Sequence, residues 1–238
     1  MSRCGGATAG SAASRGQGLP GHSPPPRTWL LSAPMTAFDL ALFEAPLMVP
    51  RLESGPVLLR PFALSDLPLI RQASTDPYIP SVTSVPSTYS DDGGRAFIER
   101  QQSQASGGHG YPFVIAESSN PDRGLGGLGL WLHEIESGRA SIGYWVAPGA
   151  RGNNLAGWAL RGVVTFAFQV LAIPRLQLFI EPWNIASQRT AEFADFTQEA
   201  LLRGWERIDH VQRDVFSYAL LRQGESFPPR AEDVDVLP

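Results

Sequence analysis

From residue 56 onward, the hydrophobic positions of the chain follow two periods, one typical of strands and one typical of helices. Alternating or short apolar runs bounded by Gly, Pro, Asn or Ser predict strands. Seven segments have this character: 57–62, 111–117, 124–135, 140–148, 175–181, 200–208 and 214–222. The last two lie close enough in the sequence to form a hairpin.

Four segments carry helix signals instead. Ser65 and Ser90 are each placed to cap a helix, because a serine hydroxyl accepts a hydrogen bond from a first-turn N–H. A third helix starts after residue 154, with apolar residues at near-helical spacing until Pro174 ends it. Residues 184–193 form the fourth.

This order of elements predicts an α/β (α+β) domain over residues 56–224. Consecutive strands favour antiparallel pairing, whereas the strand–helix–strand unit across 141–181 requires one parallel pair with a right-handed crossover. We therefore expect a mixed, mainly antiparallel sheet.

The remaining segments are expected to lie outside this domain. Residues 1–34 are rich in Gly, Ser, Ala and Pro, which predicts a disordered tail, and Met35 is an alternative translation start. Residues 35–55 are a lead-in segment that we expect to pack on the core. Residues 225–238 are expected to form a flexible C-terminal tail.

The composition narrows the function classes. The chain has 238 residues, of which 43% are hydrophobic and 18% charged, enough to build a buried core. Its net charge of −4 argues against a nucleic-acid partner. All 19 basic residues are Arg, which excludes a Schiff-base lysine and a P-loop lysine. No segment reaches the ~18 apolar residues of a membrane span, so we expect no membrane partner.

Cysteine and histidine give no sign of a metal site. Cys4 is the single cysteine, which excludes an internal disulfide and a cysteine-based zinc site and fits a reducing compartment. The four histidines have no partners at metal-ligand spacing. We therefore expect no bound metal and a cytoplasmic location.

The segment after Val146 predicts an anion site. A strand ends there, and the sequence Arg-Gly-Asn-Asn at 151–154 leads directly into the third helix. Small and turn-tolerant residues let the N–H groups of 152–156 converge on one point, where the helix dipole adds positive potential. A pyrophosphate fits this arrangement, and a strand-to-helix turn without a ligand is the alternative. The spacing matches neither the GxGxxG fingerprint nor the Walker A pattern.

Four segments resemble the GNAT superfamily of acyl-CoA-dependent N-acetyltransferases. They are LLRPFALSDLPLI, IGYWVAPGARGNNLAGWAL, IEPWNIASQRTAEFADF and RDVFSYALL, in the order and at the spacing of the family. The likeness runs from Val57 to Arg222. It is greatest for the subgroup that includes the ribosomal-protein N-terminal acetyltransferases.

The resemblance implies a GNAT fold with about six to seven strands, about four helices and a V-shaped splay between the fourth and fifth strands. It implies acetyl-CoA as co-substrate and direct attack on its thioester by a primary amine. The acceptor would be a protein N-terminal α-amine or a small molecule, and the protein a monomer or homodimer. The alternative is a catalytically silent GNAT fold that binds an acyl-CoA or a partner protein.

The resemblance also implies which residues hold the co-substrate. The backbone at the end of the fourth strand would pair with the pantetheine arm, and the loop N–H groups would hold the pyrophosphate. The implied residues are Trp145, Val146, Arg151, Gly152, Asn153, Asn154, Leu155, Ala156, Asn184 and Ser187.

Several positions depart from the family pattern. Asn154 replaces the middle glycine of the loop, and Asp195 stands where glycine is common. Both residue types adopt the left-handed backbone conformation more readily than other non-glycine residues, so both turns are expected to survive. Ala191 stands where many members place a tyrosine acid.

In the subgroup, the serine of an N-x-A-S motif supplies the proton of the leaving thiolate. Asn184 and Ser187 occupy this motif, and the alternative is that they only cap a helix. Glu206 is the preferred general base, because its spacing from Ser187 matches the catalytic carboxylate of the subgroup. The alternatives are that Glu206 is a solvated glutamate on an edge strand, that Glu134 or Glu136 is the base, or that a water chain carries the proton. Ser141, where a carboxylate often occurs, is too weak a base.

Residues 74–89 are the expected wall of the acceptor site. This stretch is rich in Pro and Ser, which predicts a loop that closes on the acceptor.

Overall fold

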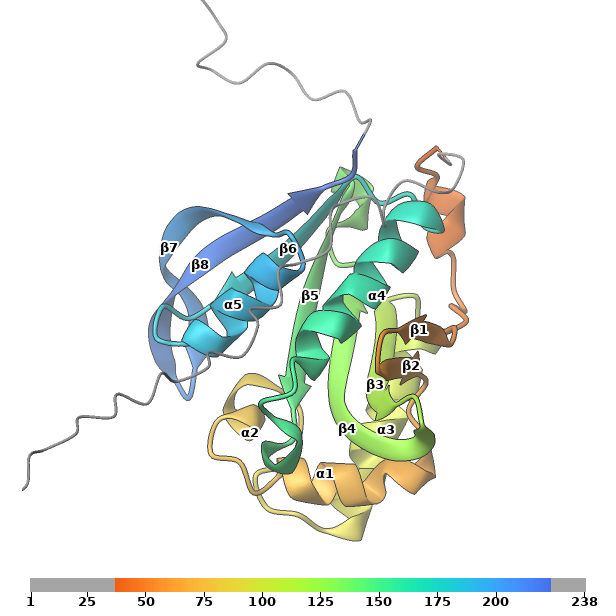
Figure 1. Ribbon diagram of the computed structural model, residues 1–238, viewed down its shortest axis with the longest axis vertical. Helices are drawn as coiled ribbons and strands as arrows, with labels where there is room; N and C mark the ends of the chain where they lie inside the picture. Colours follow the sequence, from red (N-terminus) through yellow and green to blue (C-terminus); the bar gives the residue numbers. More distant parts are fainter. Residues whose placement is uncertain (1–36, 224–238) are drawn as a thin grey trace, which may run out of the picture. The chain divides into compact units, whose positions relative to one another are not determined.

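A mixed eight-stranded sheet organises residues 37–223, the part of the chain that the computed structural model describes (Figure 1). The strand order is β1-β2-β3-β4-β5-β6-β8-β7. The strands are β1 (Leu52–Ser54), β2 (Val57–Arg60), β3 (Gly110–Glu117), β4 (Asn120–Trp131), β5 (Arg139–Val146), β6 (Arg175–Ile180), β7 (Thr197–Ile208) and β8 (Val211–Leu221). The expected tails, 1–34 and 225–238, lie outside the described residues.

Five α-helices lie within the same residues. They are α1 (Leu67–Ala73), α2 (Ile79–Val82), α3 (Asp91–Ser106), α4 (Leu155–Gln169) and α5 (Ile185–Phe193). Four of them match the helices that the sequence predicts. The short helix α2 arises inside 74–89, where the sequence predicts only a loop.

The sheet confirms the expected mainly antiparallel pairing with one parallel pair. It has eight strands, whereas six to seven were expected. Every neighbouring pair is antiparallel except β5 and β6, which are parallel. The additional strand is β1, which pairs with β2 through three residues at the edge of the sheet. Its shortness explains why no alternation marks it in the sequence.

The two parallel strands, β5 and β6, pair over a short stretch and then separate, which is the V-shaped splay that the family resemblance implies. Arg139–Ser141 of β5 pair with Arg175–Gln177 of β6, and the two strands then separate. Figure 1 shows them together at one end and apart at the other. These are the fourth and fifth strands that the sequence predicts, because β1 shifts the numbering by one. The rest of β5, as far as Val146, keeps its pairing with β4 on the other side.

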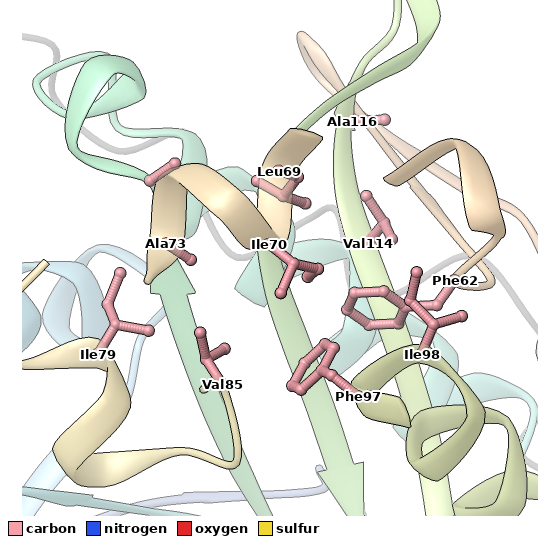
Figure 2. Packing of buried hydrophobic residues seen from close by; sticks show 11 residues of the cluster. Phe62, Leu69, Ile70, Ala73, Ile79, Val85, Phe97, Ile98, Val114 and Ala116 are labelled. Carbon is pink, nitrogen blue, oxygen red and sulfur yellow. The ribbon is translucent and has the colours of Figure 1, made fainter. Parts of the chain in front are cut away.

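The first three helices share a hydrophobic core with the sheet (Figure 2). The cluster joins Ile70 of α1, Ile79 of α2 and Phe97 of α3 to Val114 of β3, and all four side chains are buried. Burying a side chain of this size contributes about 1.5–3 kcal/mol. Because Ile79 belongs to this core, the segment 74–89 is a packed wall.

The two predicted helix caps have different outcomes. The Ser90 hydroxyl accepts a hydrogen bond from Gly93 N at 3.0 Å and caps α3, as expected. The expected cap by Ser65 is wrong. A 3-10 turn precedes α1, and the buried Asp66 carboxylate occupies that position, where it accepts from Ala63 N at 2.9 Å and pairs with Arg60 at 2.6 Å. A carboxylate with an arginine partner satisfies this turn more strongly than a hydroxyl would.

The lead-in segment lies against the rest of the fold through two buried side chains, Phe43 and Leu47. Phe43 ends a 3-10 helix, Leu40–Phe43. Among residues 37–223, no helix has both the length and the apolar character needed to cross a bilayer.

Candidate active site

A cavity of about 790 Å³ lies where β5 and β6 separate. Its walls come from α2 and α3 on one side and from β4, β5, β6 and the β7–β8 hairpin on the other. The expected acceptor wall contributes Tyr78 and residues 81–84. The volume is within the range of small-molecule binding sites.

The three predicted catalytic residues all line this cavity. Asn184 and Ser187 reach it from the start of α5, and Glu206 reaches it from β7. Asn184 also caps α5, because its Oδ1 accepts from Ser187 N at 3.1 Å. The capping geometry is therefore present, and it fixes Ser187 at the cavity edge. Glu206 is exposed to solvent and lies opposite Arg213 across the hairpin.

Tyr144 connects the two sides of the splay. Its hydroxyl donates to the Ser187 carbonyl oxygen at 3.1 Å, so β5 is joined to the first turn of α5. Burial raises the pKa of Tyr144 to about 12. The phenol therefore stays protonated and remains a donor throughout the neutral range.

The predicted anion loop lies at the start of α4, beside the end of β5. Asn154 adopts the left-handed conformation (φ 51°), as the sequence predicts, and so does Asp195 (φ 64°). Gly152 has φ 93°, and a Cβ built there meets nothing within 4 Å. No side chain caps α4. The N–H groups of its first turn therefore have no side-chain cap, as an anion site requires, and Gly152 beside them leaves open space on its Cβ side.

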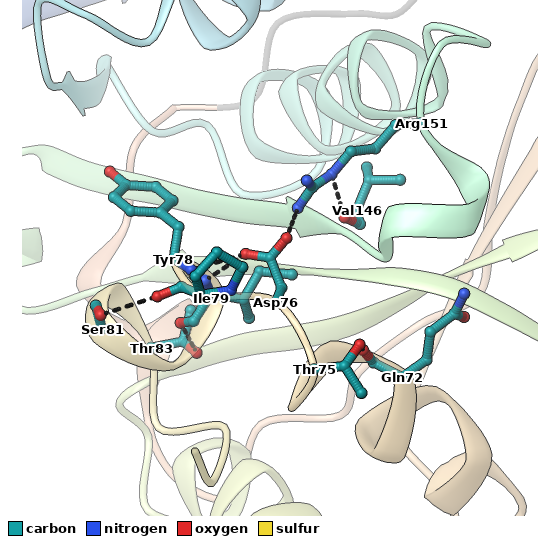
Figure 3. A network of polar contacts seen from close by, with 10 residues as sticks. Gln72, Thr75, Asp76, Tyr78, Ile79, Ser81, Thr83, Val146 and Arg151 are labelled. Atoms are coloured by element: carbon teal, nitrogen blue, oxygen red, sulfur yellow. Dashed lines mark hydrogen bonds and ion pairs between the residues drawn. The ribbon is translucent and has the colours of Figure 1, made fainter. Parts of the chain in front are cut away.

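Arg151 begins this loop, and its guanidinium makes two contacts (Figure 3). Its Nε donates to the Val146 carbonyl oxygen at 3.1 Å, and its second terminal nitrogen donates to Asp76 at 2.7 Å. Asp76 also accepts from the backbone N–H groups of Tyr78 and Ile79, each at 2.9 Å. The sequence did not reveal this network, because Asp76 lies 75 positions from Arg151 in the chain.

The pKa of the Asp76 carboxyl is lowered overall. Burial of the group acts in the opposite direction, but hydrogen bonds from Ile79 and Tyr78, together with Arg151, outweigh it. Asp76 is therefore ionised at neutral pH. It holds the start of α2 beside the anion loop.

Trp131 and Trp145 form part of the cavity lining over a glycine-rich floor. Gly129 of β4 pairs with Gly143 of β5, and a Cβ on Gly129 would lie 2.2 Å from the Trp131 ring. Only glycine lets that ring lie over the strand. The partly buried side chain of Trp145 packs against the hydrophobic core shown in Figure 2, and the predicted pantetheine contact uses its backbone. Trp183 is 60% exposed.

The site contains one carboxylate that the sequence did not single out, Glu181. It follows the last residue of β6, is 6% exposed and lines the cavity. The Tyr78 hydroxyl donates to its Oε2 at 2.6 Å. Burial, and then this bond to Glu181, raises the pKa of Tyr78 well above its usual value, so the phenol remains a donor.

A metal role finds no support in residues 37–223, where no three His, Cys, Asp or Glu side chains group as metal ligands do. His133 lines the cavity and is stacked against Trp131, with ring centroids 6.5 Å apart.

Comparisons with known proteins agree on one family. The family model described as an acetyltransferase (GNAT) domain matches residues 57–197, more than half of the chain. N-acetyltransferase p20 of Bacillus licheniformis, itself uncharacterised, is 26% identical over 165 residues, which cover 69% of this chain and 92% of p20.

Two solved structures share the fold. One is RimL, a ribosomal L7/L12 α-N-protein acetyltransferase in complex with coenzyme A; its TM-score is 0.63 at 20% identity, covering 74% of this chain and 99% of RimL. The other is the microcin C7 self-immunity acetyltransferase MccE in complex with acetyl-CoA and AMP, with a TM-score of 0.62 at 20% identity, covering 77% of this chain and 99% of MccE.

Proposed function

The chain belongs to the GNAT acetyltransferase family, and from this membership we propose that it transfers the acetyl group of acetyl-CoA to a primary amine. One observation carries the proposal. Strands β5 and β6 part after three residue pairs, and β5 then leads into the uncapped start of α4. An unpaired strand edge and an open helix N-terminus are the two features that a pantetheine arm and a pyrophosphate need.

The residues at these two places fit the co-substrate. The backbone of Trp145 and Val146 would hydrogen-bond to the pantetheine arm. The N–H groups of 152–156 would hold the pyrophosphate. The chain needs no lysine here, because backbone donors and the helix dipole supply the attraction.

Two side chains would move the protons of the reaction. Glu206 takes the proton that the amine must lose before its lone pair can attack, and its solvent exposure lets it pass that proton to water. Ser187 donates a proton to the leaving thiolate. Asn184 holds Ser187 in place through the capping hydrogen bond.

The proposed acceptor is a protein N-terminal α-amine, with a small-molecule amine as the second candidate. RimL is named as a ribosomal L7/L12 α-N-protein acetyltransferase, whereas MccE is named as a microcin C7 self-immunity acetyltransferase. The cavity, of about 790 Å³ and with polar, aromatic and aliphatic side chains in its lining, is compatible with either kind of amine.

A turnover assay tests the proposal. The full chain is incubated with acetyl-CoA and a panel of N-terminal peptides and small primary amines, and release of the CoA thiol is followed. Amine-dependent release supports the acetyltransferase. Tight binding of acetyl-CoA without release for any amine would instead support the catalytically silent alternative.

A further inference from the structure

Glu181 is a buried carboxylate in the cavity wall that the proposed reaction leaves without a role. Its side chain is 6% exposed. Its Oε2 accepts from the Tyr78 hydroxyl at 2.6 Å, and its Oε1 lies 3.9 Å from Arg213 Nε. Tyr78 lies at the start of α2 and Arg213 lies on β8, so Glu181 has neighbours from two separate elements.

This carboxylate is incompletely paired for so buried a charge. An ionised carboxylate offers about four acceptor positions, and the Tyr78 hydroxyl fills one of them. The Arg213 side chain is 50% exposed and lies at the outer limit of an ion pair, so water screens its attraction. A buried negative charge with few donors is stabilised by any further cation that enters the cavity.

The position of Glu181 also differs from that of Glu206. Glu181 follows the last residue of β6, one of the two strands that border the splay. Glu206 belongs to β7, which β8 separates from β6. A buried group beside the splay is suited to hold a charge, whereas an exposed group is suited to exchange protons with water.

We propose that Glu181 binds the acceptor amine in its ammonium form, and so selects amines that are cationic at neutral pH over neutral aromatic amines. Alkyl amines and protein α-amines qualify, because their pKa values are about 7.7–10.4. This proposal rests on the proposed acetyl transfer. Tyr78 positions the carboxylate, and Glu206 removes the proton once the ammonium is bound.

A pair of nearly isosteric probes tests this role without turnover. The full chain, saturated with desulfo-CoA, is titrated with 2-phenylethylamine and with 2-phenylethanol, and ligand binding is followed by NMR. The wild type should bind the ammonium probe at least about tenfold more tightly, as expected for a hydrogen bond to a charged group. Equal affinity for the two probes in the wild type would overturn the proposal, whatever the variants do.

Three variants locate the effect. Glu181→Gln should reduce the ratio of the affinities for 2-phenylethylamine and 2-phenylethanol to about one, because it removes the charge and keeps the shape of the side chain. Tyr78→Phe should retain most of the preference, since it removes the hydroxyl and leaves the carboxylate charged. Glu206→Gln should retain it as well. A preference that survives in Glu181→Gln, or that disappears only in Glu206→Gln, would assign the ammonium to another group.

The desulfo-CoA titration separates this proposal from the proposed function. If desulfo-CoA binds and the ammonium preference is absent, only the role of Glu181 is wrong. If desulfo-CoA does not bind, the proposed acetyl transfer itself is contradicted.

Discussion

The Arg151 guanidinium donates to the Asp76 carboxylate at 2.7 Å and so joins the anion loop to the acceptor wall. Asp76 is 5% exposed, whereas half of the Arg151 side chain is in solvent. The buried partner also accepts from the first N–H groups of the α2 segment. One carboxylate thus sets the geometry of both substrate-facing segments.

Asp76→Asn should destabilise the fold in a way that depends on pH. The folded-state pKa of Asp76 is lowered, so its stabilisation is complete above the unfolded pKa of about 3.9 and is lost as the pH falls through the folded value. We expect the variant to lose about 1–3 kcal/mol of unfolding free energy at pH 7. The difference from wild type should shrink below about pH 4.

Denaturant unfolding at pH 7 and pH 3 measures this effect. Asp92→Asn is the control, because Asp92 is exposed in the first turn of α3 and its charge is screened by water. A difference for Asp76→Asn that stayed constant from pH 7 to pH 3 would mean that packing, and not the charge, holds this segment.

Substitutions at Asn154 test the backbone cradle. Its φ of 51° is accessible to Asn and Gly, but it is strained for a β-branched residue. Asn154→Gly should preserve or improve acetyl-CoA affinity, since the site uses N–H groups. Asn154→Val should weaken affinity and lower the melting temperature. Calorimetric titration of both variants with acetyl-CoA measures these affinities. A large loss of affinity in Asn154→Gly would show that the loop is not part of the binding site.

Glu206→Gln should lower turnover by about 10²–10⁴-fold with little change in acetyl-CoA binding, as expected for a lost acid–base group. Glu199→Gln is the control on the same strand, because Glu199 pairs with Arg175 away from the cavity lining. Steady-state rates across pH compare the two. Unchanged turnover in Glu206→Gln would exclude Glu206 from the reaction.

Ser187→Ala should reduce the rate of thiol release while leaving the α5 cap intact, because the cap uses the Ser187 backbone N–H. The expected loss is about 10²-fold or more. Ser141→Ala provides the comparison, since Ser141 also lines the cavity but has no proposed proton role. If both alanine variants slowed the reaction equally, Ser187 would be a packing residue.

The sequence predicted the fold well because its local signals are strong. Seven strands and four helices followed from periodicity, and the left-handed turns at Asn154 and Asp195 followed from residue type. Strand β1 was not predicted, because three residues on a sheet edge carry no period. The helix cap at Ser65 was wrong, because the competing Asp66 gains its strength from Arg60, six positions away.

The site was predicted less completely, because its contacts join distant segments. Asn184, Ser187 and Glu206 meet at one cavity, as the family pattern suggested. Glu181 was missed because a charged residue after a strand usually faces solvent, whereas here it is buried and accepts a hydrogen bond from Tyr78, 103 positions away. Such a contact depends on tertiary packing and leaves no local trace in the sequence.

The splay between β5 and β6 and the loop before α4 should together bind the CoA moiety. Calorimetric titration of the full chain with acetyl-CoA and, in parallel, with desulfo-CoA measures this binding. We expect one site with micromolar affinity for both ligands, because pantetheine and pyrophosphate supply the contacts and the sulfur does not. If neither ligand bound, the splay and the loop would not form a CoA site.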